Sequence, residues 1–211
     1  MDCFHAEQAS ILHDGSAVLD VGGNRIKKRG QFNIENYDLR VTYANLTTAK
    51  GPDVQSDAAW LPFVDESFDA VVCSELLEHV PDPPSVLKEA FRVLRRGGVI
   101  LICVPFIYQI HGDPYDFGRY TDYYWLNHLG KIGFTNIVIK KQGLFWSVLT
   151  DMVRAWLYDL DKAGTLRFRK TAVAMMARSK KMAVERDARS ESMVHPFYSS
   201  FTTGFGIVAG K

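Results

Sequence analysis

Hydrophobic residues along this chain gather in short runs that end in small, acidic or glycine residues. Three of these runs, Ala17–Val21, Ala70–Cys73 and Val99–Val104, are apolar almost throughout. Such runs are typical of strands that are covered on both faces, as in a parallel sheet. Shorter or less apolar segments predict further strands at residues 39–45, 53–56, 134–141 and 204–209.

Between these runs the apolar residues recur with helical spacing. A helix is predicted over Pro84–Leu94, with Gly97 and Gly98 closing its far end, and a short one over Cys3–Leu12. Thr121 is expected to cap another helix that reaches about Leu129. Strands that alternate with helices predict an α/β fold with a doubly wound sheet. Ligands of such sheets bind at the carboxyl ends of the strands, where this chain carries its acids and glycines.

Two motifs are more specific than the glycines. The run Leu-Pro-Phe-x-Asp-x-Ser-Phe-Asp spans Leu61–Asp69, and Leu-Glu-His-Val-Pro-Asp-Pro spans Leu77–Pro83. With the strand ends, they resemble the class I S-adenosylmethionine (SAM)-dependent methyltransferases, type 11 small-molecule branch, from Ser16 to Phe134 and again at 205–211. The resemblance implies a Rossmann-like sheet of about seven strands with the last one antiparallel. It also implies SAM as cofactor and S-adenosylhomocysteine as product.

In that family a short hairpin joins strands six and seven, whereas about sixty residues intervene here. We therefore expect a SAM-binding core at 1–141, a helical insertion at 142–203 and a final core strand at 204–211. The insertion begins with an amphipathic stretch, Phe145–Leu160, and continues with a basic one, 165–189. Its expected roles are a lid, a homodimer or peripheral membrane contact through 145–190, or a packed helical embellishment.

The resemblance assigns the cofactor contacts to the strand ends. The residues are Asp20, Gly22 and Gly23 after strand one, Asn45 or Thr47 at the ribose, Asp57 and Ala58 at the adenine, and Ser74 and Glu75 beside the methionine part. Two departures stand out, because Asn24 and Ile26 replace family glycines and no acid ends strand two. Asparagine tolerates a positive φ better than isoleucine does.

Each of these acids also has a purely structural interpretation. Asp57 could satisfy its own loop backbone, and Asp20 could hold the glycine turn. Glu78 and His79 are expected to cap a turn before Pro81 rather than to take part in catalysis.

A polar cluster follows strand five and is the best candidate for the acceptor side. His111 is the expected general base, because imidazole titrates near neutral pH. Asp116 or Asp113 would orient it, and Arg119 would bind an acidic group of the acceptor or pair with Asp116. No metal is expected, since the spacing of these residues is not distinctive and the three cysteines are not paired.

The composition limits the classes of molecule that this chain is expected to bind. With 47% apolar residues and a net charge of +1, the chain suits a packed globular protein rather than a nucleic-acid binder. The opening residues hold no long apolar run, and Asp151 and Arg154 interrupt the longest apolar segment. A cytoplasmic protein without a membrane-spanning segment is expected.

The sequence is compatible with two functions. The first is a SAM-dependent methyltransferase that acts on a small molecule, favouring oxygen, with a sugar or natural-product acceptor. The alternative is a catalytically inactive methyltransferase-like binding or scaffold protein, which the altered glycine turn would favour. A nicotinamide dehydrogenase fits poorly, because the chain lacks the Gly-x-Gly-x-x-Gly turn.

Overall fold

The computed structural model describes residues 2–25, 33–112, 114–163 and 169–211. Within these ranges, no helix combines the length and the apolar character that crossing a membrane requires. The chain divides into two compact units. The first comprises Met1–Pro105, Ile110–Lys140 and Phe205–Lys211, and the second comprises Phe106–Gln109 and Lys141–Gly204.

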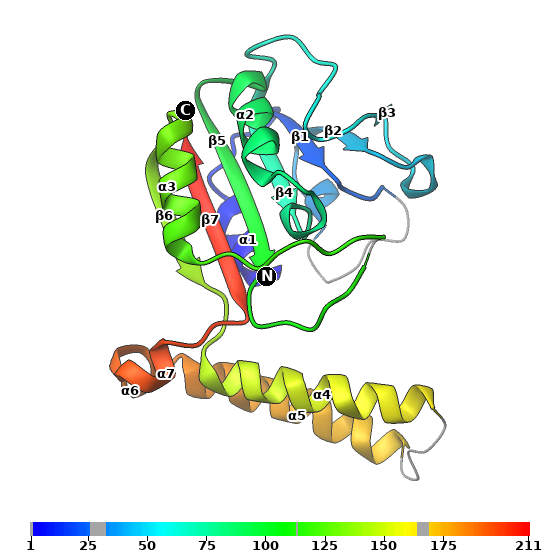
Figure 1. Cartoon of the computed structure of the whole chain (residues 1–211), viewed down its shortest axis with the longest axis vertical. Helices are drawn as coiled ribbons and strands as arrows, with labels where there is room; N and C mark the ends of the chain where they lie inside the picture. The colour runs from blue at the N-terminus through cyan, green and yellow to red at the C-terminus, as the bar shows by residue number, and fades with distance from the viewer. Residues whose placement is uncertain (1, 26–32, 113, 164–168) are drawn as a thin grey trace. The chain divides into compact units, whose positions relative to one another are not determined.

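The first unit is built on a seven-stranded sheet with the strand order β3-β2-β1-β4-β5-β7-β6 (Figure 1). The strands are β1 Ala17–Val21, β2 Arg40–Asn45, β3 Val54–Gln55, β4 Phe68–Ser74, β5 Leu94–Pro105, β6 Thr135–Lys141 and β7 Gly204–Gly210. Strands β1 to β5 pair in parallel. β7 runs antiparallel to β5, since the Lys211 N–H donates to the Gly98 carbonyl at 2.9 Å. The predicted Rossmann-like fold, with its last strand antiparallel, is confirmed.

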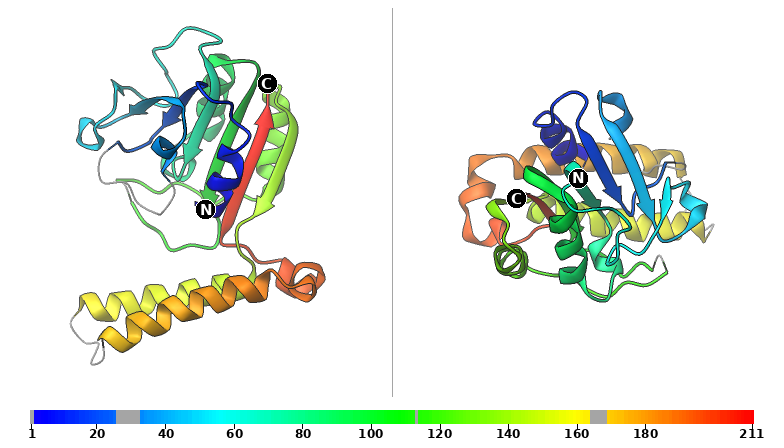
Figure 2. Two further views of the ribbon diagram at one scale, coloured as in Figure 1. Left: turned by 180° about the vertical axis from the view of Figure 1, so that it is seen from behind. Right: turned by 90° about the horizontal axis from the view of Figure 1, so that it is seen from above.

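Three helices cover this sheet, with α1 (Asp2–Ala9) on one face and α2 (Pro83–Val93) and α3 (Asp122–Ile132) on the other (Figure 2). The predicted capping of α3 is confirmed, because Thr121 Oγ1 accepts from the Tyr124 N–H at 3.4 Å. Gly133 ends the helix with φ +117°, a left-handed conformation that glycine adopts without steric cost. Short 3-10 turns lie at η1 Ile34–Asn36, η2 Thr48–Lys50 and η3 Leu77–His79.

The register brings the carboxyl ends of the central strands together. Val21 at the end of β1 pairs with Ala44 on β2 and with Cys73 on β4. The strand order reverses between β1 and β4, and ligands of doubly wound sheets bind at such a switch point. The residues that follow these strand ends therefore share one edge of the sheet.

The helix predicted over Pro84–Leu94 is confirmed as α2, but its predicted closure by Gly97 and Gly98 is wrong. Helix α2 ends at Val93, and β5 already begins at Leu94, which is extended and pairs with Phe68 of β4. The register then shifts, so that the next matched pair is Ala70 with Val99. Residues 95–98 form an irregularity inside β5, with Gly97 at φ +77°. Strand β5 starts at Leu94 because it pairs there with β4, and the local sequence carries no signal of this pairing.

Most of the second unit is the helical insertion between β6 and β7. Helices α4 (Phe145–Lys162) and α5 (Arg169–Asp187) lie side by side as an antiparallel hairpin, followed by α6 (Ser190–Val194) and α7 (Pro196–Ser199) (Figure 1). Lys180 Nζ on α5 lies 2.5 Å from Asp151 Oδ2 on α4 and joins the two helices.

Asp187 anchors the start of α4 from the end of α5. Its side chain is buried, and its carboxylate accepts from the backbone N–H groups of Leu144 at 2.8 Å, Trp146 at 3.1 Å and Ser147 at 3.0 Å. These are the N–H groups that a helix leaves without internal partners at its amino end. The Arg186 guanidinium lies over the Trp146 ring, 4.0 Å from its centre. The hairpin thus has its own buried polar anchor.

One stripe of α4 is exposed and apolar. It consists of Leu149, Met152, Val153 and Trp156, which recur at helical spacing. The expected lid, dimer and membrane-contact roles of residues 145–190 stay predictions.

Candidate cofactor and acceptor site

The turn after β1 requires both of its glycines. Gly22 has φ +79°, and a Cβ there would lie 2.9 Å from Leu76 Cδ1. At Gly23 a Cβ would lie 2.3 Å from Asp20 Oδ2, so the Asp20 carboxylate packs directly against this turn. The structural interpretation of Asp20, as the acid that holds the turn, fits this contact. Its contact with the cofactor stays a prediction.

Asn45 supports the same turn from the end of β2. Its buried side-chain amide donates to the carbonyls of Gly22 at 2.8 Å and Gly23 at 3.1 Å, and its Oδ1 accepts from the Thr47 N–H at 3.1 Å. The Thr47 hydroxyl accepts from the Ala49 N–H at 3.3 Å. Asn45 therefore positions the glycine turn, while its predicted contact with ribose stays untested.

Asn24 does not use the positive φ that the sequence suggested for it. Among the described non-glycine residues only Glu66, Glu75 and Asn136 have positive φ values. Ile26, the other departure from the glycine pattern, lies outside the described residues. The Asn24 Oδ1 atom is buried and accepts no hydrogen bond from the described part of the chain. It is an acceptor that a ligand donor would satisfy.

Arg25, which the sequence did not single out, ties this segment to the neighbouring strands. Its guanidinium lies 2.7 Å from Asp53 Oδ2 and stacks over the Tyr43 ring, 5.0 Å from the ring centre. The same Asp53 oxygen accepts from the Tyr43 N–H at 2.9 Å. The chain after the glycine turn is thus fixed to β2 and β3 by a charged pair.

Asp57 follows β3, whose end is fixed by the Ser56 N–H donating to the Asn45 carbonyl at 3.0 Å. The Asp57 carboxylate accepts from the Ala59 N–H at 2.8 Å, which is the structural interpretation of this acid. Ala58 lies within the same turn, and the adenine role of both residues stays a prediction. The Ser56 hydroxyl is buried and has no hydrogen-bond partner in the described ranges.

Arg92 explains why the Leu-Pro-Phe-x-Asp motif keeps its shape. From α2, its guanidinium donates to the carbonyls of Leu61 at 2.9 Å and Phe63 at 2.7 Å and pairs with Asp65 at 2.9 Å. Glu89 also binds Arg92, and this hydrogen bond lowers the pKa of the Glu89 carboxyl. The motif is therefore a clamped loop that leads into β4.

Ser74 and Glu75 lie at the end of β4, as predicted. Glu75 adopts φ +49°, and its N–H donates to the Cys103 carbonyl of β5 at 2.9 Å. Nearby protein atoms, and then the Glu78 carboxylate, raise the pKa of Glu75 to about 8, although the Glu75 residue itself is exposed to solvent. This edge of the sheet thus carries two interacting acids.

On the acceptor side, Asp116 holds the neighbouring polar residues together. Its carboxylate receives both terminal nitrogens of Arg119, at 2.5 and 2.7 Å, and the His111 backbone N–H at 2.8 Å. The Arg119 hydrogen bonds, ahead of the other contacts, hold the Asp116 pKa well below its usual range. His111 Nδ1 lies 3.3 Å from Asp116 Oδ2 and 3.4 Å from Arg119 Nη2. The three predicted catalytic residues therefore meet, and Asp113 lies outside the described residues.

Glu78 and His79 lie on the turn η3 before Pro81, as predicted, but the predicted capping role of Glu78 is wrong. Glu78 caps nothing, because no side chain caps η3 and α2 begins after Asp82. Its side chain is 1% exposed, and neither carboxylate oxygen has a hydrogen-bond partner among the described residues. Burial raises its pKa. A charged residue between the apolar Leu77 and Val80 was the signal in the sequence.

The loop that carries His111 closes over this buried acid. The Phe117 N–H donates to the Glu78 carbonyl at 2.7 Å, and the His79 Nδ1 atom lies 2.6 Å from the Tyr115 carbonyl. His79 Nε2 lies 3.6 Å from Glu78 Oε1, and the rings of His79 and His111 meet edge to face at 4.9 Å. We call Glu78, His79 and His111 the Glu-His-His cluster.

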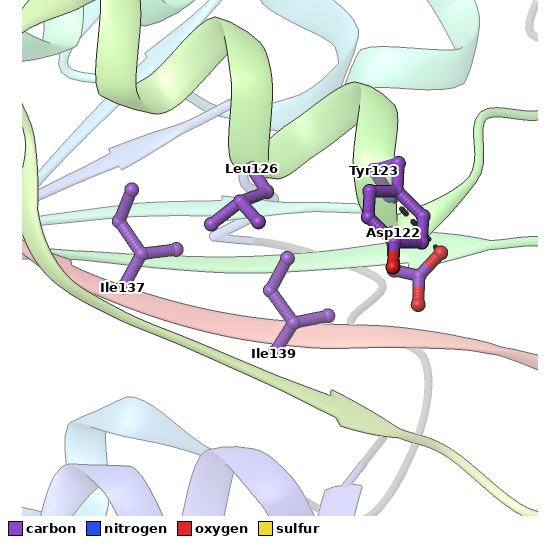
Figure 3. Close-up of a pocket in the computed structure, with 5 residues that line it drawn as sticks. All are labelled: Asp122, Tyr123, Leu126, Ile137 and Ile139. Carbon is purple, nitrogen blue, oxygen red and sulfur yellow. Dashed lines mark hydrogen bonds between the residues drawn. The ribbon is translucent and has the colours of Figure 1, made fainter.

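An apolar groove lies between α3 and β6 (Figure 3), away from these residues. Its lining consists of Asp122, Tyr123, Leu126, Ile137 and Ile139. None of the predicted site residues lines it. The strand-end edge is therefore the better candidate.

Comparison with known proteins agrees with this geometry. A methyltransferase-domain family model matches residues 24–102. A putative methyltransferase from Bacillus halodurans, 20% identical, superposes with a TM-score of 0.56 over 97% of this chain and 96% of its own. Phosphoethanolamine N-methyltransferase 2 of Haemonchus contortus, solved with S-adenosylhomocysteine, is 14% identical, with a TM-score of 0.61 over 100% of this chain and 52% of its own. This chain is therefore similar to methyltransferase domains in sequence over residues 24–102 and shares the fold of SAM-dependent methyltransferases.

Two relatives of this chain are named for their activity. A Haemophilus ducreyi ubiquinone/menaquinone biosynthesis C-methyltransferase is 33% identical over 60% of this chain and 41% of its own length. The rice chloroplastic 2-methyl-6-phytyl-1,4-hydroquinone methyltransferase 1 is 27% identical over 66% of this chain and 47% of its own. The chain spans less than half of the length of both relatives.

Proposed function

We propose that this protein transfers the methyl group of SAM to an oxygen of a small-molecule acceptor. The observation that carries the proposal is the convergence of polar groups at one edge of the sheet. The glycine turn ends β1, buried acceptor-capable atoms of Asn24 and Ser56 lack described partners, and the Glu-His-His cluster follows β4 and β5. The similarity of residues 24–102 to a methyltransferase-domain family model supports the choice of cofactor.

The cofactor would lie along the strand ends. The close approach of backbone at Gly22 and Gly23 suits a nucleoside ligand, and Asp57 with the Ala58 N–H would bind the adenine edge. Ser74 and Glu75 would line the methionine part, and Asp20 would face the charged sulfonium end. The Asn24 and Ser56 side-chain oxygens, which are buried without described partners, would receive ligand donors.

Methyl transfer is an in-line displacement in which the sulfonium is already an activated leaving group. The acceptor oxygen forms a bond to the methyl carbon as the carbon–sulfur bond breaks, and S-adenosylhomocysteine leaves. The protein must orient the acceptor and take up its hydroxyl proton. We assign that proton to His111, whose ring Asp116 orients and Arg119 holds in place through Asp116.

The acceptor class follows from this chemistry and from the relatives. A phenol gives up its proton more readily than an alcohol. One matched relative is named for a 1,4-hydroquinone substrate, and the other for C-methyl transfer in ubiquinone and menaquinone biosynthesis. We therefore place a hydroxylated aromatic ring first, with a sugar or natural-product hydroxyl as the other source of the same group.

Calorimetric titration of the purified chain with SAM and with S-adenosylhomocysteine tests the cofactor assignment. Micromolar binding supports it, and Asp57→Ala should weaken it at least tenfold if Asp57 accepts from adenine, about the worth of one charge-assisted hydrogen bond. Asp14→Ala, an exposed turn acid, is the matched control. Absence of binding at millimolar ligand would overturn the proposal and favour a non-catalytic binding protein.

Methyl transfer itself is tested with labelled SAM against a panel of catechols, quinols and sugars. His111→Ala should lower turnover by roughly 10²–10⁴-fold while leaving the SAM dissociation constant nearly unchanged. His13→Ala, an exposed histidine outside the site, serves as control. Undiminished turnover in His111→Ala would remove His111 from the mechanism.

A further inference from the structure

The Glu-His-His cluster has the composition of a metal site. One ligand atom from each of Glu78, His79 and His111 lies within 4.8 Å of the other two. Two imidazole nitrogens and one carboxylate oxygen are the ligand set that zinc and other divalent first-row metals accept in proteins. The donors come from two segments, η3 and the loop after β5, so the tertiary fold and not local spacing assembles them.

The burial of Glu78 is the independent observation that points to a cation. Its side chain is 1% exposed, and neither oxygen accepts a hydrogen bond from any residue that the structure describes. A buried carboxylate without hydrogen-bond partners is costly, because it has lost its water and nearby positive groups offset only part of that loss. The charged groups that face it are His79, Arg119 and Asp116, with Glu75 beside it. Arg119 is already paired with Asp116, so the acids outnumber the available positive charge.

The surroundings of both histidines orient them as metal ligands. His79 Nδ1 lies 2.6 Å from the Tyr115 carbonyl oxygen, which fixes Nδ1 as the donor and directs the Nε2 lone pair toward Glu78 at 3.6 Å. His111 Nδ1 lies 3.3 Å from the Asp116 carboxylate. Metal-bound histidines usually donate their second nitrogen to a carbonyl or a carboxylate, and His79 has this arrangement with the Tyr115 carbonyl. His111 would have it in the tautomer whose Nδ1 donates to Asp116 instead of accepting from Arg119 Nη2, which lies 3.4 Å away.

We infer that Glu78, His79 and His111 bind one divalent transition-metal ion, of the zinc, manganese or cobalt kind. Metal–nitrogen distances of about 2.1 Å place ligand atoms at most about 4 Å apart, so the cluster contracts by a fraction of its present spacing on binding. Three protein ligands leave coordination positions open for water or for an acceptor oxygen. An acceptor hydroxyl bound there would release its proton to solvent water more readily. With the ion bound, His111 would be a metal ligand and would not itself take up that proton.

Direct binding measurements test this inference without any methyl transfer. The full chain, freed of metal with a chelator, is titrated with Zn²⁺ in a calorimeter and with Co²⁺ in a spectrophotometer. One equivalent of either ion should bind, and Co²⁺ should give a visible absorption band of nitrogen and oxygen coordination. Glu78→Gln and His79→Ala should each weaken binding more than tenfold, and Asp116→Asn by roughly 10–100-fold through His111.

Matched controls are Glu7→Gln and His13→Ala, exposed residues that should bind the ion like the parent chain. The inference is overturned if the parent chain binds no ion, or if Glu78→Gln and His79→Ala bind it unchanged. Circular dichroism first confirms the fold of each variant, and His79→Ala, at a partly exposed position, remains informative if Glu78→Gln does not fold. SAM titration of the metal-free chain keeps the outcomes apart. If the chain binds SAM but no metal ion, only the metal-site inference is overturned. If it binds the metal ion but not SAM, only the proposed methyl transfer is overturned.

Discussion

Two buried carboxylates in this chain have opposite surroundings. Asp187, at the end of α5, accepts from three backbone N–H groups at the start of α4. Glu78, in η3, is at least as deeply buried, and the described residues offer its oxygens no hydrogen bond. The first acid completes a helix end and stabilises the folded hairpin. The second destabilises the fold on its own, and a ligand would offset that cost.

The difference separates a structural acid from a functional candidate on physical grounds. Burial alone does not separate them, since both side chains are almost inaccessible to solvent. Their partners do, because a satisfied carboxylate gains nothing from a cation, whereas an unsatisfied one gains a great deal. The contrast also predicts opposite signs for the effect of neutralising each acid.

Removing the satisfied acid should have the largest effect. Asp187→Ala leaves three buried N–H groups at the start of α4 without acceptors, and we expect the free energy of unfolding to fall by about 2–3 kcal/mol. Urea denaturation followed by circular dichroism measures it. Asp159→Ala, an exposed acid on α4, is the control and should change little. Equal losses in the two variants would contradict the anchoring role of Asp187.

Neutralising the unsatisfied acid should have the opposite sign. Glu78→Gln keeps the shape but removes the desolvated charge, so the metal-free chain should gain about 1 kcal/mol of unfolding free energy. Thermal and urea unfolding in the presence of a chelator measure the gain. Glu185→Gln, an exposed acid of α5, should be neutral. A loss of stability in Glu78→Gln would mean that the contrast with Asp187 does not hold.

Replacing Asp69 should change stability least. Asp69 extends the comparison to a partly exposed carboxylate that has hydrogen-bond partners. Its carboxylate accepts from the Ala17 N–H at 2.8 Å and pairs with Arg95 at 2.6 Å, and these contacts, led by the Ala17 hydrogen bond, lower its pKa. A lowered folded-state pKa means that Asp69 stabilises the fold above its unfolded pKa. That contribution is lost as the pH falls through the folded-state value.

For Asp69→Asn we expect a loss of less than about 1 kcal/mol at neutral pH, because solvent screens the Arg95 pair. The loss should shrink toward about pH 3, where the parent carboxyl also protonates. Unfolding measured across this pH range, with the exposed Asp38→Asn as control, checks both statements. A loss that does not depend on pH would assign the effect to packing instead.

Much of the fold could be predicted because its signals are local. Apolar runs gave the strands, and Thr121 gave the start of α3, since a capping hydroxyl and the N–H that it accepts from lie within one turn. The start of β5 was wrong because it depends on pairing with Phe68, which is distant in sequence. Local glycines at 97 and 98 indicated a helix end where the sheet required an irregular strand.

In the candidate site, too, local contacts were predictable and long-range contacts were not. The Asp116–Arg119 pair was predictable as an option, because both residues lie in one short loop. The support of the glycine turn by Asn45, and the burial of Glu78, were not predictable. Asn45 binds Gly22, and Phe117 lies against the Glu78 backbone. Both of these neighbours are distant in sequence. Long-range pairing sets what each polar side chain can still offer to a ligand.

The place of β7 between β5 and β6 has a consequence for how the chain is assembled. β6 is joined to the sheet only through β7, which is made after the whole insertion. Until residues 204–210 arrive, β5 therefore has an open edge and β6 has no neighbour. The insertion leaves and returns at one point, where the Gln142 N–H donates to the Gly204 carbonyl at 2.8 Å. Lengthening or shortening the helical hairpin beyond that point would leave the strand order intact, which makes it the natural place to graft or remove sequence.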